Sequence, residues 1–372
     1  MRSPVSIRTI QYLWSTIGLV CFILFVGEAL GQEELWNKNM QAAKIAYANN
    51  KYLEAEQHVL AAIETAETFP SEDPRVGSSI DLLAHVYKAT GRFKDAESRF
   101  EDALEIFATR LGPAHPWTMA ELNNLAGFYS ELGRYSDAAP LYRLALNRLV
   151  RTLGPKHPSV AVVLTNLAEI YDQQERYPEA EALYRESLSI TQETLGPGHP
   201  TVAATMNNLG FHYSDQDRFV EAKAQYEGAL EILKKSTGLR HPLAAAIYNG
   251  LGVIYRKQAR FDRAENYHRK ALEVLDLTVG LDHPHAAAVR HELALLYIRQ
   301  GKYADAESNL QQALDIREQK FGTENPKVAS TLETYAALLR ELGRNSEAEE
   351  MEIRTKAIQK KTGGLDLANP IQ

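Results

Sequence analysis

Regularly spaced histidines are the residues of this sequence that first suggest metal or acid–base chemistry. An imidazole can bind a metal ion or act as a general base, and five of them recur every 42 residues, each directly before a proline: His115, His157, His199, His241 and His283. A zinc ion needs its ligands within about 2.1 Å, whereas equivalent positions of stacked helical hairpins lie about two helix diameters apart. Because proline suits the first turn of a helix, we expect each histidine to mark a helix start. Asp73 and Asn325, which are good capping residues, occupy the same position.

No other group of residues predicts catalysis. His85, His212, His268 and His291 are scattered without a paired nucleophile, and the chain has no G-x-S-x-G, H-E-x-x-H or phosphate-loop motif. The single cysteine, Cys21, lies near the N-terminus, so the rest of the chain can form no internal disulfide and no thiolate metal site. We therefore expect no catalytic residues, no metal and no cofactor, and a protein that is not an enzyme.

The composition is that of a folded protein that does not bind nucleic acid. Of 372 residues, 45% are hydrophobic and 24% are charged, which is an ordinary globular balance. The net charge is −7 and no run of lysines and arginines forms a basic stripe, which disfavours nucleic-acid binding. A chain of this length either divides into domains or forms a linear array, and a search for repeats decides between these.

A repeat of 42 residues runs through most of the chain. Prolines and aromatic residues keep this step without insertion: Pro74, Pro116, Pro158, Pro200, Pro242, Pro284 and Pro326, and Phe93, Tyr135, Tyr177, Phe219, Phe261 and Tyr303. In the unit that begins at Pro116, a first helix is expected to about residue 132 and a second from about 136 to 153, and a glycine follows each. Each unit is therefore a helical hairpin.

Each hairpin has an apolar face that it cannot bury alone. In the first helix, Leu122, Leu125, Ala126 and Tyr129 form one stripe at helical spacing. Neighbouring hairpins must stack to cover such stripes. We therefore predict an all-α fold, a right-handed α-solenoid of about eight hairpins. They are expected near residues 34–69, 74–111, 116–153, 158–195, 200–237, 242–279, 284–321 and 326–361, within a solenoid of residues 32–361, and a flexible tail is expected at 362–372.

The repeat resembles a known family. The pattern Leu125-Ala126, Tyr129, Gly133, Tyr135, Ala138, Tyr142, Ala145 resembles the tetratricopeptide repeat, and the 42-residue unit, with the phrase Leu153-Gly154-Pro155-Lys156-His157-Pro158-Ser159-Val160-Ala161, looks like the subgroup named after kinesin light chains. The resemblance covers about residues 34–360 and implies a scaffold that binds peptide segments in a concave groove. Unlike kinesin light chains, the chain has no heptad segment for pairing with a motor chain and carries an expected export signal, so cargo transport is not expected.

Asparagines recur on the helix face that would line such a groove. At 100° per residue, the side of the first helix opposite Leu125 carries Asn123, Asn124, Gly127 and Ser130. Stepping by 42 residues predicts a groove-lining asparagine set: Asn123, Asn124, Asn166, Asn207, Asn208 and Asn249. A side-chain amide can pair with the backbone of an extended peptide of any sequence. A second interpretation is that these amides bond neighbouring helices and set the superhelical angle.

The charge on this face changes sign along the array. Carboxylates lie on the earlier repeats and basic residues at matching places later, which gives the further groove candidates Asp172, Asp215, Arg256, Lys257 and Arg299. A ligand with one basic and one acidic end would be bound in a single orientation. The alternative is a scattered, solvated surface, because Glu333 and Glu341 interrupt the basic end.

Three turns lack the glycine that the others have. Glu175, Asp217 and Ala259 occupy the position that is Gly133 or Gly301 in other units. If this turn needs a positive φ, each substitution costs roughly 1 kcal/mol relative to glycine. The middle repeats are therefore expected to be slightly less stable.

The N-terminus is typical of an export signal. Residues 1–31 begin with Arg2 and Arg8, continue through an apolar stretch, and end in Ala29-Leu30-Gly31, so we expect cleavage before Gln32. The apolar stretch is shorter than the roughly 20 residues that span a bilayer. The alternative is an uncleaved membrane anchor at residues 12–30.

Taken together, these patterns predict an exported scaffold, periplasmic or secreted, that binds an extended peptide or partner segment in the groove of a repeat array. Its partner is a protein or peptide rather than a nucleic acid, and the sequence does not identify it. A membrane-anchored or self-associating structural scaffold of the cell envelope is the alternative.

Overall fold

The computed structural model describes residues 30–70 and 73–362, and all regular secondary structure in these ranges is helical. This confirms the predicted all-α class of stacked hairpins. The predicted signal or anchor up to residue 29 and the predicted tail from residue 363 lie outside the described residues. No described helix is long and apolar enough to cross a membrane. The described helices form two compact units, one of residues 30–70, 73–88 and 94–115 and one of residues 89–93 and 116–362.

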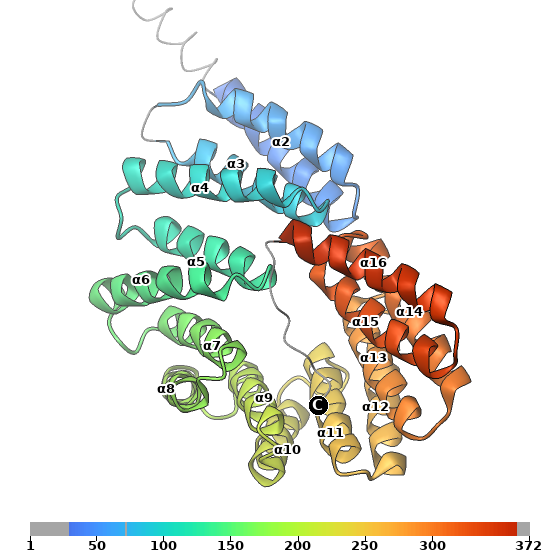
Figure 1. The fold of residues 1–372 in the computed structure, drawn as a ribbon. Helices are drawn as coiled ribbons and strands as arrows, with labels where there is room; N and C mark the ends of the chain where they lie inside the picture. Colours follow the sequence, from blue (N-terminus) through green and yellow to red (C-terminus); the bar gives the residue numbers. More distant parts are fainter. Residues whose placement is uncertain (1–29, 71–72, 363–372) are drawn as a thin grey trace, which may run out of the picture. The chain divides into compact units, whose positions relative to one another are not determined.

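The first unit contains a helix over residues 30–48 and the helices α2 (Tyr52–Ala66), α3 (Arg75–Ala89) and α4 (Phe93–Arg110) (Figure 1). Val76, Ile80 and Phe107 form its core together with buried alanines of α2 and α4. The Trp36 indole donates a hydrogen bond to the Ser79 hydroxyl over 3.0 Å, which ties the first helix to α3.

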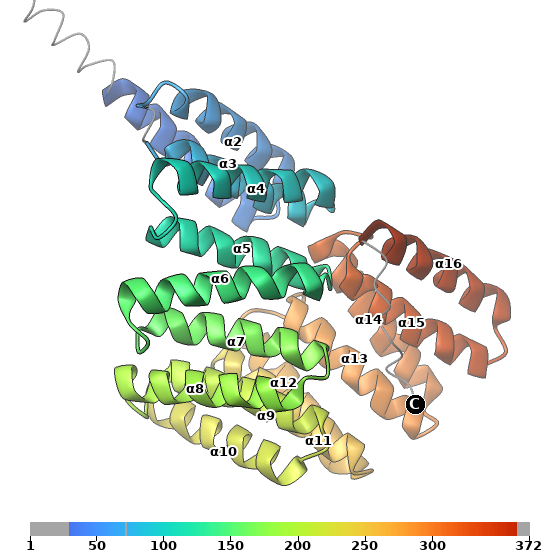
Figure 2. The ribbon, with the colours of Figure 1, turned by 60° about the vertical axis from the view of Figure 1, so that its left-hand side comes forward.

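The second unit consists of six hairpins in chain order (Figure 2). Their first helices are α5 (Pro116–Glu131), α7 (Pro158–Gln173), α9 (Pro200–Asp215), α11 (Pro242–Lys257), α13 (Pro284–Arg299) and α15 (Pro326–Glu341). Their second helices are α6 (Tyr135–Leu153), α8 (Tyr177–Leu195), α10 (Phe219–Lys235), α12 (Phe261–Asp276), α14 (Tyr303–Phe321) and α16 (Asn345–Thr362).

Four of the five regularly spaced histidines cap helices, as predicted. In α7, α9, α11 and α13 the Nδ1 atom of the N-cap histidine accepts a hydrogen bond from the backbone N–H two residues later, over 3.1–3.2 Å. At α15, Asn325 Oδ1 accepts the same bond from the N–H of Lys327 over 2.9 Å. Proline follows at the first helical position, where its missing N–H leaves no bond unmade.

The turns within the hairpins adopt the left-handed conformation that the sequence suggested. Gly133 and Gly301 have φ angles of 68° and 70°, and Glu175, Asp217 and Ala259 have φ angles of 57°, 57° and 56°. A side chain with a Cβ is strained at these angles, so the three non-glycine residues each cost stability.

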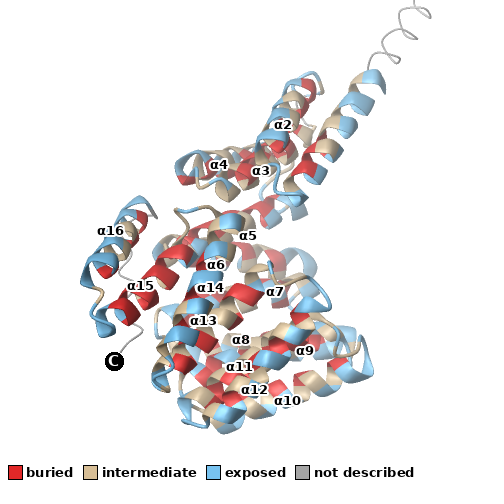
Figure 3. Cartoon of the chain, turned by 90° about the vertical axis from the view of Figure 1, so that its right-hand side faces the viewer, coloured by how far each residue is buried: buried red, intermediate tan, exposed pale blue. Residues whose placement is uncertain are grey.

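The second unit is built in two layers. Each first helix contacts its own second helix and also the first helix of the next hairpin. Tyrosines recur at the 42-residue step of the first helices, and those at positions 129, 171, 213, 255 and 297 are buried, whereas Tyr87 of the first unit is half-buried. Buried residues lie where neighbouring helices meet, and exposed residues lie on the outer faces (Figure 3). The first helices thereby present a continuous inner surface.

Candidate binding groove

A groove of about 1460 Å³ runs along the first helices of the second unit, lined by residues from α5 to α15. Equivalent residues of successive helices line it because the hairpins repeat in register. Whether the groove surface is apolar, polar or charged at a given point therefore depends on the residue types that occupy equivalent positions, 42 residues apart.

An apolar strip lies on the groove surface. Phe211 on α9, Val253 on α11 and Leu295 on α13 are 42 residues apart and all line the groove. Phe211 is 55% exposed, which is unusual for so large an apolar side chain. The equivalent Gly127 was predicted to lie on this face. The apolar residues at the same position of later repeats were not predicted, although the 42-residue step leads from Gly127 to them.

Of the predicted asparagines, Asn207, Asn208 and Asn249 line the groove, whereas Asn123, Asn124 and Asn166 do not. The Asn166 amide donates to Asn123 Oδ1 over 2.9 Å and so joins α7 to α5. For this pair the structure favours the second interpretation, bonding between helices. The Asn208 amide donates to Glu169 Oε1 over 3.3 Å, and Asn249 Oδ1 lies 2.9 Å from His268 Nδ1.

The predicted charged residues Asp172, Asp215, Arg256, Lys257 and Arg299 all line the groove. The basic ones are largely neutralised within the array. The Arg256 guanidinium lies 2.9 Å from Glu292, and the Lys257 ammonium lies 3.0 Å from both Asp217 and the carbonyl oxygen of Ser214. Arg299 is exposed and has no ion-pair partner among the described residues. Most of the basic end is therefore committed to contacts within the protein.

The acidic end has fewer such contacts. Glu169 and Asp172 lie one helical turn apart on α7, and Asp215 ends α9. Burial, together with the nearby Asp172 carboxylate, raises the pKa of Glu169 to about 7. Glu169 is nevertheless exposed to solvent, so the raised pKa reflects the groove walls around the carboxylate and the charge of Asp172 rather than full burial. Burial also raises the pKa of Asp215; Asp172 and Asp217 raise it further, and Lys257 opposes them.

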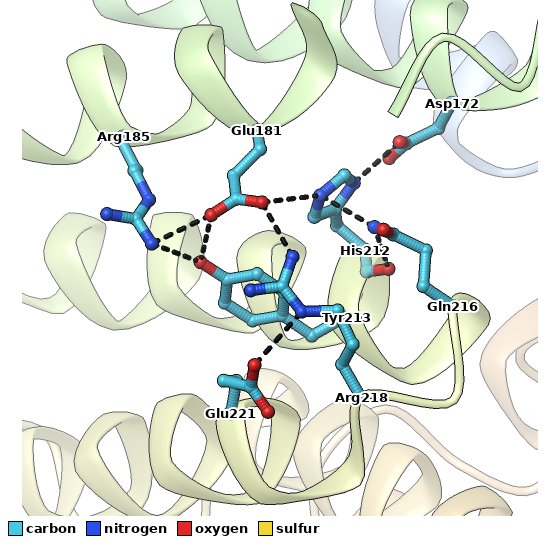
Figure 4. A network of polar contacts seen from close by, with 8 residues as sticks. All are labelled: Asp172, Glu181, Arg185, His212, Tyr213, Gln216, Arg218 and Glu221. Atoms are coloured by element: carbon cyan, nitrogen blue, oxygen red, sulfur yellow. Dashed lines mark hydrogen bonds and ion pairs between the residues drawn. The ribbon is translucent and has the colours of Figure 1, made fainter. Parts of the chain in front are cut away.

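Asp172 takes part in a buried polar contact between two hairpins (Figure 4). Its Oδ1 lies 2.6 Å from His212 Nδ1, and the side chains of His212 and Asp172 are 0% and 5% exposed. The Gln216 amide nitrogen lies 2.8 Å from His212 Nε2. Asp172 Oδ2 has no hydrogen-bond partner in the described part of the chain.

His212 interrupts an otherwise apolar register. The six equivalent residues are all apolar and buried: Val86, Phe128, Ile170, Ile254, Leu296 and Leu338. The 42-residue register already distinguishes His212 from the scattered histidines, because it is the one polar residue at this particular core position. Asp172 stands where the neighbouring repeats have Ser130 and Ser214.

Further ionic contacts fix this junction from its outer side (Figure 4). Glu181 on α8 accepts hydrogen bonds from Arg218 over 2.6 Å and from the Tyr213 hydroxyl over 3.0 Å. Burial alone would raise the pKa of Glu181, but these two donors outweigh it and lower the pKa. The hairpins α7–α8 and α9–α10 are thereby held in a defined orientation, which positions Glu169 and Asp215.

Two histidines beneath the basic end are buried in neutral form. Burial lowers the pKa of His268 to about 3 and that of His291 to about 3, and the positive charge of Arg256 contributes to both. His268 occupies the position of the buried Tyr142, Tyr184 and Tyr226. No group of three or more histidines, cysteines and carboxylates in the described residues could hold a metal ion.

Comparison with known proteins places this arrangement in a family. The tetratricopeptide repeat family model matches residues 34–109, 117–193, 166–235, 201–276 and 285–361. No curated protein matches the chain.

Several solved structures are similar to this chain, and RapI shares its fold. The apo form of RapI is 15% identical with a TM-score of 0.59, and the match covers 76% of this chain and 98% of RapI. A putative kinesin light chain from Podosopora anserina with TPR-like repeats is 26% identical with a TM-score of 0.48, covering 54% of this chain and 95% of that one. BtubC (BKLC) from P. vanneervenii is 24% identical with a TM-score of 0.46, covering 65% and 94%. The family match extends over well more than half of the sequence, and the chain belongs to the tetratricopeptide repeat family.

Proposed function

We propose that this protein is a non-enzymatic scaffold that binds an extended segment of a partner protein in the groove of its second unit. Tetratricopeptide repeats in general mediate protein–protein interactions. The observation that carries the finer proposal is the apolar strip within a long groove, in which Phe211 is exposed and Val253 and Leu295 are half-buried.

The groove offers the two kinds of contact that an extended segment needs. The apolar strip can bury alternate side chains, and amides such as Asn207 can pair with backbone N–H and C=O groups irrespective of sequence. Neighbouring first helices lie about 10 Å apart, which matches roughly three residues of extended chain. The groove can therefore follow a segment over several repeats.

A pair of matched variants tests this function. We expect Phe211→Ser to lose partners that the full-length chain captures from its native extract, because the substitution removes apolar contact area from the groove. Val220→Ser is the control, since Val220 is 82% exposed and does not line the groove. Equal capture by both variants, with helicity unchanged by circular dichroism, would move binding away from the groove.

We also propose that the scaffold is exported, on the basis of the N-terminal signal in residues 1–31. N-terminal sequencing of the native protein tests this proposal. Gln32 as the first residue supports cleavage and export, whereas Met1 together with membrane association supports the anchored alternative.

A further inference from the structure

Two exposed carboxylates at the acidic end of the groove, Glu169 and Asp215, have no ion-pair partner among the described residues. We propose that Glu169, Asp172 and Asp215 form a subsite for a basic side chain of the partner segment, an arginine above all. This inference rests on the proposed groove-binding function and names the chemistry of the ligand.

The three carboxylates converge from two neighbouring helices. Glu169 and Asp172 share one face of α7, Asp215 lies at the end of α9, and all three line the same groove. The Asp172 side chain is 5% exposed, and its Oδ2 atom has no hydrogen-bond partner in the described residues. A buried carboxylate oxygen without a donor is costly, and a cation placed beside it removes part of that cost.

The cations of the protein itself do not complete this subsite. The Lys257 ammonium is held 3.0 Å from Asp217 and from the carbonyl oxygen of Ser214. His212 satisfies only Oδ1 of Asp172, and Glu169 accepts its hydrogen bond from the neutral amide of Asn208. Lys257 and His212 act on Asp215 only through space, so a basic group of a ligand can still pair directly with Glu169 and Asp215.

An organic cation fits this subsite better than a metal ion. The described residues contain no group of three or more carboxylates, histidines and cysteines that could hold a metal ion. A guanidinium group is planar and carries five N–H donors, so it can bond to two separate carboxylates at once. A lysine ammonium carries the same charge but has a smaller reach.

The register of the groove fixes where the basic residue stands in the segment. Glu169 on α7 and Phe211 on α9 are 42 residues apart and occupy equivalent positions of adjacent repeats. A spacing of about 10 Å between adjacent helices corresponds to about three residues of extended chain. We therefore expect the basic residue about three positions from a large apolar residue that lies on Phe211.

We expect binding at this subsite to be coupled to the release of a proton from Glu169. Burial and Asp172 raise the pKa of Glu169 to about 7 in the free protein, and a bound cation lowers it again. The other groups that face this carboxylate are Asn208 from α9 and the buried hydroxyls of Tyr142 and Tyr184, which stay protonated because their own pKa values are raised. Asp215 adds to the effect, since its pKa is raised too.

Selection from a library of random dodecapeptides displayed on phage tests the subsite with the full-length chain. We expect the selected peptides to carry arginine or lysine about three residues from a large apolar residue. Selection on Glu169→Gln/Asp215→Asn should lose the basic residue and keep the apolar one. The control Asp262→Asn removes the same kind of charge from an exposed position at the start of α12, outside the groove, and should select the same peptides as the unaltered chain.

The two proposals fail in different ways in this experiment. If no peptide is selected on the unaltered chain in preference to Phe211→Ser, the groove-binding function is wrong. If selection depends on Phe211 but yields no basic residue, or yields one that survives Glu169→Gln/Asp215→Asn, groove binding stands and the subsite is wrong.

Affinity as a function of pH gives an independent readout. We expect an N-acetylated, histidine-free selected peptide to bind about tenfold more weakly at pH 6 than at pH 8, because a carboxyl of pKa about 7 is mostly protonated at pH 6. Replacing its arginine by the neutral citrulline, or Glu169 by glutamine, should abolish this dependence. A dependence that persists in both cases would overturn the role of Glu169.

Discussion

The two ends of the groove contain similar numbers of charged side chains but treat them differently. At the basic end, Arg256 is paired with Glu292 and Lys257 with Asp217, and the underlying His268 is held neutral. Of the predicted basic residues, Arg299 alone has no ion-pair partner among the described residues. At the acidic end, Glu169 and Asp215 have raised pKa values and only neutral or distant partners. A charge that the fold already neutralises contributes little to recognition, whereas an uncompensated one favours a ligand of opposite sign. The groove is therefore electrostatically asymmetric in a way that counting charges does not show.

The largest expected effect comes from the buried pair that supports the acidic end. Asp172→Ser removes the acceptor of the buried His212 ring and should lower the free energy of unfolding by about 3–5 kcal/mol, measured by urea denaturation. The double variant Asp172→Ser/His212→Ile introduces residues found at the equivalent positions Ser214 and Ile254. It should recover most of that loss. A double variant as unstable as the single one would show that the pair is not what holds the junction.

At the basic end, breaking an ion pair should cost less. Glu292→Gln leaves the partly buried Arg256 without its carboxylate and should lower the free energy of unfolding by about 1.5–3 kcal/mol. Glu349→Gln, on the exposed face of α16, is a control with the same charge change and should alter stability by less than about 0.5 kcal/mol. Thermal unfolding at pH 8 distinguishes the two.

Neutral burial of His268 predicts a loss of stability in acid. The folded-state pKa, about 3, lies below the ordinary value of 6.5, so the unfolded chain binds the proton more tightly and stability falls as the pH drops from 6.5 towards 3. His268→Leu, which matches the buried Leu310 at the equivalent position, should remove about 2 kcal/mol of the loss between pH 8 and pH 5. Unfolding curves of both proteins at the two pH values test this. An unchanged pH dependence would contradict the neutral burial.

Most of the fold could be predicted because it follows from one repeated constraint. Several kinds of residue recur at a fixed step, and each has a local physical reason: the proline at each helix start, the buried alanines and tyrosines, and the turn glycines. The repeat determines the backbone conformation even where the residue type changes. The turn at Ala259 has a φ of 56°, close to that of the glycines at the equivalent positions.

The candidate site could be predicted only in part. The helix face that lines the groove follows from the apolar stripe, and Asn207, Asp215 and Arg256 line that groove. Their role in binding a peptide stays a prediction. Partner choice was not predictable, because it depends on side-chain reach across repeats: Asn166 bonds to Asn123, and Arg256 bonds to Glu292, 36 residues further along the chain. Residues that depart from the repeated pattern, such as His212, indicate where one repeat makes a specific contact with the next, which the pattern itself does not show.

The smallest expected effect is the most specific for the acidic end. The folded-state pKa of Glu169, about 7, lies above the ordinary value of 4.5. Glu169 therefore has no effect on stability below about pH 4.5, destabilises the fold increasingly as the pH rises towards 7, and exerts its full effect above that pH. Glu169→Gln should therefore raise stability at pH 8 and leave it unchanged at pH 4. Because the side chain reaches solvent, the gain should be less than about 1 kcal/mol. Thermal unfolding at both pH values measures it, with Glu193→Gln as an exposed carboxylate control that pairs with Lys156. We expect this gain at pH 8 to disappear when an arginine-containing peptide is bound. The guanidinium of the peptide then stabilises the ionised Glu169, so replacing this carboxylate by an amide no longer raises stability. Such a result would show that the same carboxylate affects both stability and recognition.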